Sequence, residues 1–510
     1  MTVLVTAKQA YPAFEGLFLE ARADITLGFR IFDPLTPLHS TAARAVGDTW
    51  VDLIVATLNR GVTITMTLSD FDPIAGYGLH RDTWKAARIL LALNEMTNEG
   101  AARFSLTCMR HPAQGGLFAR LLFAPQTRKK LRAIARDLND NSKQDATLRF
   151  LPALREMLEK RDETVTLKPW TLPKIYPVTL HQKMAIFDGE TTYIGGLDLN
   201  ARRYDDHDHN RPAQETWHDV QLILRDTALA QDSAAFLRTL PATVTGQQPP
   251  PAIRSRLCTT LSRMRHNRLF GLAPETVSDG LLQAHLAAIR AARTFIYIET
   301  QYFRDRRIAA ALAEAGRKNP KLSVLMLLPA APEVIAFETE LSLDARYGEY
   351  LQARAIKQVR KVFGDRFYIV SPVQPRAIGK GDSKIERAAL ADAPIVYVHA
   401  KVSIFDDTCA IVGSANLNGR SLKWDTETGV VINDCAQVKT LRDAAFQHWL
   451  PSHVDPSYFA IDTAFDSWVQ LAKLNASQRP ANRQGFVMPY DLTPAKAAAL
   501  AVPGAPEELI

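Results

Sequence analysis

The stretch that decides the fold is HQKMAIFD at positions 181–188, because the chain repeats its pattern as HAKVSIFD at positions 399–406. Each copy reads His-x-Lys, followed after four residues by Asp. After six intervening residues come GGLD at 195–198 and GSAN at 413–416. A pattern that recurs with the same internal spacing indicates an internal duplication. We therefore expect two similar units, each contributing one His and one Lys.

The duplication extends beyond this motif. Residues 22–32 align with residues 293–303, and in both halves the hydrophobic pattern predicts the order helix, strand, helix, strand. Such alternation is typical of a sheet with helices on its faces. The sequence therefore predicts an α/β fold of two similar α-β-α sandwich lobes, related by a pseudo-twofold axis, with the active site at their interface. The expected helices are 50–58, 281–293 and 308–315, and the expected strands are 25–32, 62–68, 294–303 and 322–328.

A proline-rich stretch, GQQPPP at 246–251, separates the two halves. Such a run is typical of a stiff connector. We place the first lobe at residues 1–247 and the second at 248–480. Residues 481–510 are rich in Pro, Ala and Gly and are predicted to form a C-terminal tail, with residues 503–510 loosely held.

The composition is that of a globular protein, with 47% hydrophobic and 23% charged residues in a chain of 510. The 61 Lys and Arg against 54 Asp and Glu give a net charge of +7, which mildly favours anionic partners. The cysteines at 108, 258, 409 and 435 form no CxxC pair, which argues against a disulfide framework or a cysteine zinc site.

The sequence shows neither an ordinary secretory signal nor a membrane-spanning segment. Residues 1–20 lack a basic region followed by a long apolar run. The most apolar run, 322–337, is interrupted by Pro329 and Pro332 and is shorter than the ~20 residues a spanning helix needs. It is expected to be a buried strand that ends in a loop. We expect a soluble monomer, peripheral at membranes, that stays in the cytoplasm or is exported without an ordinary signal peptide.

Both motifs are predicted to lie on strands, at 177–187 and 395–405. Residues two apart on a strand share a face, so the His and the Lys of each copy point the same way. A lysine charge beside amide and backbone donors suits a phosphoryl group. Two imidazoles on opposite sides of one phosphorus allow one to attack while the other protonates the leaving oxygen. Because two lysines would replace a cation, we expect no metal and no cofactor. The residues of this set are His181, Lys183, His399 and Lys401.

Other polar residues near the motifs are predicted to have supporting roles. Asp188 and Asp406 stand at turns and are expected to cap backbone N–H groups. The basic helical face at 128–136 is interpreted as a solvated surface, with contact to anionic headgroups as the alternative. The loop at 371–394 would border the site. DHDH at 206–209 is interpreted as a solvated loop at the rim, with headgroup contact or adventitious metal binding as alternatives.

These residues resemble the phospholipase D superfamily, whose HxKx4D motif occurs twice in one chain. The resemblance spans roughly residues 15–445 and is closest to the phospholipase D branch. Thr300 is a departure, because the family has Asn there. Four further segments carry the resemblance: IGGLDL at 194–199, TWHDV at 216–220, IYIETQYF at 296–303 and IVGSANLNGRS at 411–421.

The resemblance implies a role for each residue of the repeated motif. His181 would be the nucleophile that forms a phosphohistidine. His399 would be the general acid and then the base that activates water or an alcohol. Lys183 and Lys401 would hold the phosphate oxygens. The near symmetry of the two copies leaves open which His attacks.

The resemblance also implies a supporting set. Asp219 and Glu427 would orient His181 and His399 respectively and fix their tautomers. Asp198 stands where the second copy has Asn416 and is expected to tie down its loop, because an anion facing a phosphate is unfavourable. The residues expected to bind substrate are Asn416, Ser414, Gly195, Gly196 and Gln301.

The predicted activity is that of a phospholipase D. It would hydrolyse the distal phosphodiester bond of a glycerophospholipid to phosphatidic acid and a headgroup alcohol, with possible transphosphatidylation. The alternatives are a phosphatidyltransferase of the cardiolipin synthase type and a nuclease or other phosphodiesterase. A non-catalytic binding protein is a fourth hypothesis, disfavoured by two intact His-Lys pairs. The expected partner is a phospholipid at a membrane surface, not nucleic acid.

Overall fold

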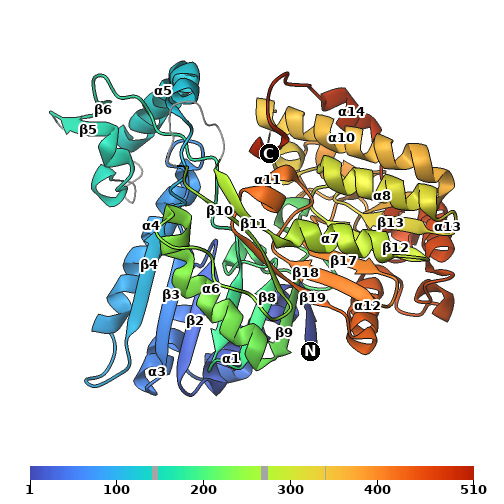
Figure 1. Cartoon of the computed structure of the whole chain (residues 1–510), viewed down its shortest axis with the longest axis horizontal. Helices are drawn as coiled ribbons and strands as arrows, with labels where there is room; N and C mark the ends of the chain where they lie inside the picture. Colours follow the sequence, from blue (N-terminus) through green and yellow to red (C-terminus); the bar gives the residue numbers. More distant parts are fainter. Residues whose placement is uncertain (141–146, 163, 266–273, 339–340) are drawn as a thin grey trace.

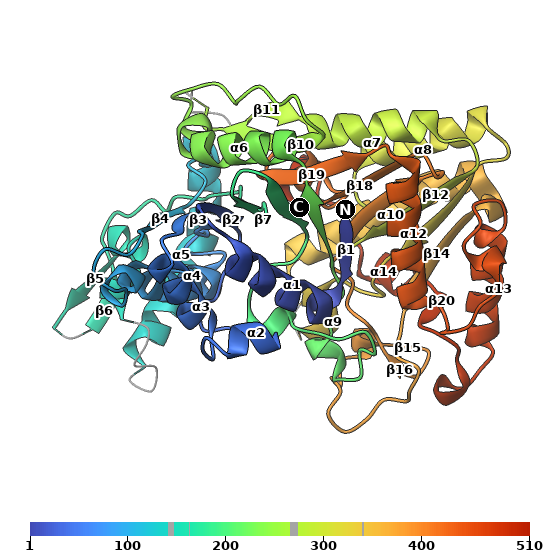
Figure 2. The same ribbon diagram turned by 90° about the horizontal axis from the view of Figure 1, so that it is seen from below.

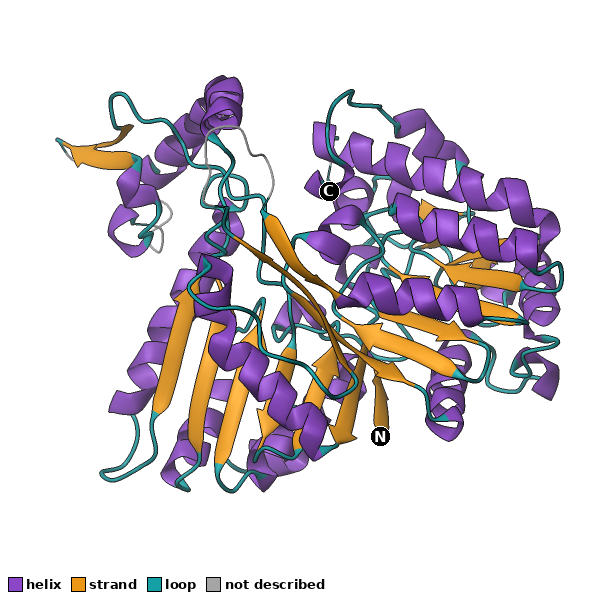
Figure 3. Ribbon diagram, in the orientation of Figure 1, coloured by secondary structure: helices purple, strands orange, loops and turns teal. Residues whose placement is uncertain are grey.

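Two large sheets form the framework of the protein (Figures 1 and 3). The computed structural model describes the chain apart from residues 141–146, 163, 266–273 and 339–340. The first sheet has the strand order β1 (Thr2–Val5), β9 (Val220–Arg225), β8 (Thr191–Gly195), β7 (Met184–Phe187), β2 (Asp24–Phe29), β3 (Thr63–Ser69) and β4 (Phe104–Met109). The second has the order β11 (Glu275–Asp279), β10 (Leu257–Arg263), β19 (Glu427–Ile432), β18 (Cys409–Gly413), β17 (Lys401–Phe405), β12 (Phe295–Thr300), β13 (Ser323–Leu327), β14 (Phe367–Pro372) and β20 (Val487–Pro489).

The two sheets repeat one topology. In the first sheet β2, β3 and β4 are parallel, while β7, β8 and β9 follow as antiparallel neighbours. In the second sheet β12, β13 and β14 are parallel, and β17, β18 and β19 follow in the same way. Strands β1 and β10 also correspond, because they pair antiparallel with β9 and β19, and the second sheet adds β11 beyond β10. The predicted α/β fold is confirmed, and the duplicated sequence corresponds to a duplicated sheet.

Alternate residues of each central strand face opposite hydrophobic cores, as a strand covered on both sides requires. On β12, Ile296 and Ile298 pack in a core with helices α7 (Gly280–Ala291) and α8 (Arg306–Lys318). Tyr297 faces the other way, toward α12 (Cys435–Trp449). That second core also contains residues of β7, β8, β9 and helix α6 (Thr227–Thr245). The two lobes therefore share one continuous core.

The first two long helices of the first lobe form where apolar residues recur at helical spacing. α1 (Thr6–Glu20) and α3 (Trp50–Asn59) bury their apolar faces against β2 and β3. A capping box between Thr49 and Asp52 starts α3 one residue after Thr49, which satisfies backbone N–H groups at its N-terminus. The expected helix at 50–58 is therefore present nearly as predicted.

The first lobe carries an insertion with a small core of its own. It contains α4 (Tyr77–Ala92), α5 (Leu117–Asn139), β5 (Leu158–Arg161) and β6 (Thr164–Leu167). Figure 2 places α5, β5 and β6 at the opposite end of the molecule from α12 and α13 (Ala464–Ala476). The basic segment 128–136 lies on α5.

The connector between the halves is shorter than its composition suggests. Helix α6 continues to Thr245 and ends at Gly246, whose φ of 81° gives the left-handed cap that glycine allows. The boundary predicted near residue 248 lies between this cap and β10.

The segment predicted to be a tail from residue 481 is instead part of the second lobe as far as Ala498. Val487–Pro489 forms the edge strand β20, which pairs antiparallel with β14. Val487 and Met488 are buried, and the Tyr490 hydroxyl accepts a hydrogen bond from Gln352. α14 (Thr493–Ala498) then packs on α10 (Leu343–Phe363). A few apolar side chains spaced along this segment outweigh its Pro and Ala content.

The described residues contain no helix that is both long and apolar enough to cross a membrane.

Candidate functional site

Each His-x-Lys segment leaves its own sheet and pairs with the other lobe. Leu180 forms a parallel bridge with Thr426, and the backbone N–H of His181 donates to the Thr426 carbonyl at 2.8 Å. Val398 bridges His218 in the same way, and the N–H of His399 donates to the His218 carbonyl at 2.8 Å. The predicted strands at 177–187 and 395–405 are therefore too long. Regular pairing within each sheet begins only at Met184 and Lys401.

These crossed bridges determine which carboxylate holds which histidine. His181 Nδ1 lies 2.8 Å from Glu427 Oε2, and His399 Nδ1 lies 2.6 Å from Asp219 Oδ2. The expected pairing of Asp219 with His181 and Glu427 with His399 is wrong. Thr426 and His218 lie beside the opposite motifs, so the carboxylate that follows each one reaches the histidine of the other lobe. Spacing within one half of the chain carries no signal of this exchange.

The carboxylates are buried, while the imidazoles reach toward solvent. Glu427 and Asp219 side chains are 0% exposed, against 12% for His181 and 7% for His399. A carboxylate on Nδ1 orients the ring and leaves Nε2 as its free nitrogen. Burial and the neighbouring lysines, Lys183 for His181 and Lys401 for His399, hold the pKa of both imidazoles well below the usual range. Burial raises the pKa of both carboxyl groups.

The two lysines fold back onto the backbone of their own motifs. Lys183 Nζ donates to the His181 carbonyl at 2.5 Å, and Lys401 Nζ donates to the His399 carbonyl. Burial lowers the pKa of Lys183 to about 8 and that of Lys401 to about 7. A buried ammonium whose pKa lies this close to neutral pH is strongly stabilised by an anionic ligand, because the ligand replaces the lost hydration.

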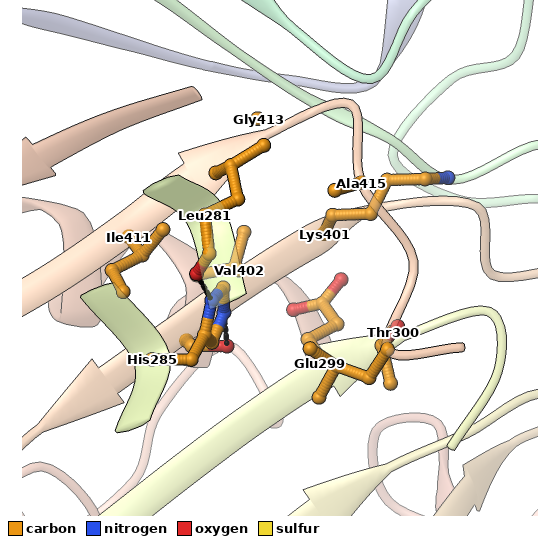
Figure 4. Close-up of a pocket in the computed structure, with 11 residues that line it drawn as sticks. Leu281, His285, Glu299, Thr300, Lys401, Val402, Ile411, Gly413 and Ala415 are labelled. Carbon is orange, nitrogen blue, oxygen red and sulfur yellow. Dashed lines mark hydrogen bonds between the residues drawn. The ribbon is translucent and has the colours of Figure 1, made fainter. Parts of the chain in front are cut away.

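A small enclosed void of about 10 Å³ lies beside Lys401 (Figure 4). It has room for roughly one water molecule. In Figure 4 the amine of Lys401 points away from His285, which lines the far side of the void. His285 is held by the Leu281 carbonyl and by Ser403. The void is therefore a packing gap behind the lysine stem.

Three residues expected to bind substrate pack against polar groups behind the histidines, two of them against the carboxylates. Ser414 is fully buried, and its hydroxyl donates to Glu427 Oε2 at 2.6 Å. Gly196 occupies the corresponding place in the first lobe, where a Cβ atom would lie 2.2 Å from Asp219 Oδ1. A Cβ on Gly195 would lie 1.9 Å from Gln221 Oε1. The Ser414 side chain and the Cβ directions of Gly195 and Gly196 face the protein interior, and a role for these residues in binding substrate stays a prediction.

Asn416 and Gln301 lie together at the site in the second lobe. The Asn416 amide donates to Gln301 Oε1 at 3.2 Å, and Gln301 donates to Tyr397 and Tyr302 hydroxyl oxygens at 2.5 and 3.0 Å. Asn416 Oδ1 is buried and has no partner among the described residues. The second N–H of the Asn416 amide remains available to orient an oxyanion, whereas Gln301 already donates both of its amide hydrogens and instead positions Asn416.

The corresponding pair in the first lobe is Asp198 with Arg30. Asp198 Oδ1 accepts the backbone N–H of Ile31 at 2.9 Å, and Oδ2 lies 3.7 Å from Arg30 Nη1 and 4.0 Å from Lys183 Nζ. Asp198 therefore holds its loop and also positions two cations. Sequence reasoning missed Arg30, although the alignment of residues 22–32 with 293–303 places it opposite Gln301.

Asp188 and Asp406 lie away from the histidines and hold the starts of β2 and β12. The Asp188 carboxylate accepts the backbone N–H groups of residues 22–24, and that of Asp406 accepts those of residues 293–295. Both residues have a φ of 51°. Each thus closes a turn at the outer end of its sheet.

A tryptophan in the segment between the motifs was also missed. The Trp217 ring lies 4.6 Å from the His399 ring, and the Arg203 guanidinium stacks 3.6 Å above Trp217. This stack fixes the His399 ring from the side and adds a positive charge nearby.

The chain matches known proteins over much of its length. The family model described as "Cardiolipin synthase, PLD-like domain" matches residues 286–449. Phospholipase D1 of Schizosaccharomyces pombe is 23% identical over 378 residues, which cover 56% of this chain and 27% of that protein. Phospholipase D1 of Mus musculus is 28% identical over 188 residues, covering 32% of this chain and 17% of that protein. The aligned parts thus span about a quarter or less of the length of these relatives.

One solved structure covers nearly the whole chain. Phosphatidylserine synthase of Haemophilus influenzae aligns over 93% of both chains, with a TM-score of 0.50 and 12% identity. At that identity the likeness shows a shared fold. The family model and the sequence relatives support membership of this chain in the phospholipase D superfamily.

Proposed function

We propose that the protein is a phospholipase D that cleaves the distal phosphodiester bond of glycerophospholipids, releasing the headgroup alcohol and phosphatidic acid. The observation that supports this most is the crossed pair of imidazoles, each held at Nδ1 by a buried carboxylate of the other lobe. Two histidines of fixed tautomer, with two lysines beside them, suit acid–base and nucleophilic work on one phosphorus.

In the first step, the lone pair of His181 Nε2 attacks phosphorus while His399, which enters the step as the imidazolium, gives its Nε2 proton to the leaving headgroup oxygen. Because the pKa of His399 is low in the free protein, it takes up this proton when the anionic phosphodiester binds. The bond to that oxygen breaks, and a phosphatidyl-histidine forms. In the second step, His399 removes a proton from water, whose oxygen attacks phosphorus and expels the His181 nitrogen. Phosphatidic acid leaves, and both imidazoles return to their starting states. A primary alcohol in place of water gives the phosphatidyl alcohol.

The lysines supply the charge that this sequence of steps needs. Lys183 and Lys401 face the negative charge that spreads over the non-bridging oxygens at phosphorus. Preorganised cations in a site shielded from water stabilise such a transition state by several kcal/mol, typically about 3 kcal/mol for one donor. Asn416, held by Gln301, adds a neutral donor on the side of the second lobe.

An exposed apolar patch on the insertion favours a lipid substrate. It lies on the first turns of α5, where Phe118 is 66% and Leu122 is 63% exposed, and it includes Trp170 at 95%. Arg120 joins the two parts through the Leu172 and Pro173 carbonyls. Exposed aromatic and aliphatic side chains next to basic ones suit insertion into a headgroup layer.

The patch is connected to the site through the chain itself. The backbone N–H of Gly115, just before α5, donates to the Ile175 carbonyl at 2.9 Å, six residues before His181. Lys129 and Lys130 on the following turns are exposed and would face anionic headgroups. We therefore infer that α5 and the Trp170 loop rest on the membrane while the site receives the headgroup.

Phosphatidyl transfer to another lipid is the second candidate, because the matching family model is described as a cardiolipin synthase domain. Vesicles of mixed phospholipids with a short primary alcohol, followed by mass spectrometry, separate the two. Phosphatidic acid and the alcohol adduct support a phospholipase D. Cardiolipin from phosphatidylglycerol vesicles supports transfer. Cleavage of DNA with no lipid turnover would contradict the proposal.

A further inference from the structure

The segment DHDH at 206–209, expected to be a solvated loop, instead turns its last histidine into the protein. His209 is 0% exposed, and its Nδ1 lies 2.6 Å from Asp205 Oδ2. Its Nε2 lies 2.9 Å from Nε2 of His448, in the last turn of α12. The loop thus joins the first lobe to a helix of the second.

A third histidine completes the group. His218 is fully buried beside His448, with ring centroids 4.5 Å apart. Its Nε2 lies against the Glu299 carboxylate, and its Nδ1 has no hydrogen-bond partner among the described residues. One ring nitrogen from each of His209, His218 and His448 lies within 4.8 Å of the others.

We propose that His209, His218 and His448 form a divalent metal site, best suited to Zn²⁺, that ties the two lobes together behind the phosphodiester site. Imidazole nitrogens are preferred ligands for zinc and similar transition metals. At Zn–N distances of about 2.0–2.1 Å, tetrahedral ligands lie about 3.3 Å apart, so these nitrogens need to move by only about an ångström.

The surroundings have the features of such a site. A metal-binding His usually donates its other ring N–H to a carboxylate, which directs the lone pair of the remaining nitrogen at the metal. Asp205 does this for His209. Glu299 stands at Nε2 of His218, which leaves Nδ1 to bind the ion. Without an ion, that buried nitrogen stays unsatisfied, which folded proteins avoid.

The site also has a route for an ion to enter. His448 is partly exposed, whereas His209 and His218 are not, so one side of the group reaches the surface. The ring of His207, which is on the same loop as His209, lies 5.7 Å from the His448 ring. Because the ligands come from the first lobe and from α12, a bound ion cross-links elements far apart in sequence.

This inference does not rest on the proposed lipid chemistry, since none of the three histidines contacts the motif lysines or the free nitrogens of His181 and His399. It is tested on the full chain, purified without a histidine tag. Zn²⁺ content is measured by mass spectrometry of the metal, and affinity by competition with a chromophoric chelator. Co²⁺ loading gives visible absorption diagnostic of a tetrahedral nitrogen site.

The wild-type chain is expected to retain about one Zn²⁺ and to melt at a higher temperature with zinc than after chelation, because an ion that binds only the folded chain stabilises it. His448→Gln is expected to weaken Zn²⁺ binding at least about tenfold, as loss of ligands or their orienting partners does. His209→Gln should behave alike. His448→Gln is the primary variant, because its partial exposure favours a folded product.

Two histidines outside the group serve as controls. His453 is exposed a few residues further along the chain, and His285 is buried with partners of its own. His453→Gln and His285→Gln should keep wild-type Zn²⁺ affinity. The inference is overturned if the wild-type chain binds no more Zn²⁺ than His448→Gln, or if His453→Gln loses as much. The group would then be a hydrogen-bonded relay from Asp205 through His209 to His448.

Discussion

The two halves of the proposed phosphodiester site are built on one plan but with different side chains. Behind His399 stand Asp219 and Gly196; behind His181 stand Glu427 and Ser414. The shorter carboxylate approaches a glycine, and the longer one accepts a bond from a serine. Each combination places a carboxylate oxygen 2.6–2.8 Å from Nδ1. Geometry at the histidine is therefore kept while its means of support differs.

The polar side chains in front of the histidines also differ between the two halves, while their net charge is the same. The first lobe presents Lys183, Arg30 and Asp198, which sum to +1 + 1 − 1 = +1. The second presents Lys401 with the neutral amides of Asn416 and Gln301, again +1. The net charges are equal but the hydrogen-bond donors are not. We therefore expect the cations of the first lobe to hold the phosphate, and the amides of the second lobe to distinguish the group attached to it. The following experiments test the comparison.

Replacing the histidines gives the largest expected effect. His181→Ala and His399→Ala should each abolish turnover, because loss of the nucleophile removes the intermediate and loss of acid–base help costs about 10²–10⁴-fold. Rapidly quenched His399→Ala should carry a phosphatidyl adduct by intact mass, and His181→Ala should carry none. The reverse pattern would exchange the two roles, and substantial turnover by either variant would contradict the mechanism.

Neutralising the lysines compares the two halves directly. Lys183→Met and Lys401→Met should each lower kcat/KM by about 10²–10³-fold, the loss typical of one preorganised donor. Lys439→Met, at an exposed position, is the control. Circular dichroism checks the fold of each variant. Full activity in either site variant would mean that the buried ammonium does not face the substrate.

Exchanging the supporting residues tests whether the two carboxylate arrangements are equivalent. Gly196→Ser alone should lower kcat by about 10–100-fold, since its new Cβ and hydroxyl displace Asp219 from His399. Adding Asp219→Glu copies the other half and should recover part of that loss, a coupling that a double-mutant cycle measures. If the effects of the two substitutions on kcat were strictly additive, the orientation of His399 would require Asp at position 219.

The pH profile distinguishes the lysines. The pKa of about 7 for Lys401 and about 8 for Lys183 means that the ammonium form is present below these values and is lost as the pH rises through them. kcat/KM, which reports the free enzyme, should therefore fall above about pH 7. In Lys401→Arg, any remaining activity should persist to higher pH, because guanidinium keeps its proton. An unchanged alkaline limb would assign the loss to another group.

The smallest expected effect concerns the exposed apolar patch on α5. Phe118→Ser and Leu122→Ser together should lower activity on vesicles about tenfold or more, since burying one such side chain contributes about 1.5–3 kcal/mol. Activity on a short-chain, monomeric phospholipid should not change. Leu474→Ser, an exposed apolar residue on α13, is the matched control. Equal losses on both substrates would indicate damage to the site instead.

Local patterns predicted the architecture well, because the repeated motif and the alternation of helices and strands are written in contiguous residues. The α/β fold, the helix at 50–58 and the clustering of polar side chains near the motifs could all be read in this way. Exchange of the carboxylates could not, since it depends on how two distant strands meet. Nor could the interior position of Ser414 and Gly196, which look like ligand-binding residues from their sequence neighbours alone.

Two further errors have the same origin. The last 30 residues have the composition of a tail, yet Val487 and Met488 meet a free sheet edge that no local pattern reveals. His209 reads as part of a polar loop, yet Asp205 and α12 create a buried place for it. At the position equivalent to His218 the second lobe has Thr426, so this histidine group breaks the repeat.

The crossed carboxylates have a consequence for the halves as separate molecules. Cut at the connector, each piece would keep its imidazole and its ammonium but lose the partner that aims the ring. Neither fragment should be active by itself at any concentration. Mixing the two fragments should restore activity. A half-length chain of this type could reach the same arrangement only by forming a dimer, in which each copy supplies the carboxylate for the histidine of the other.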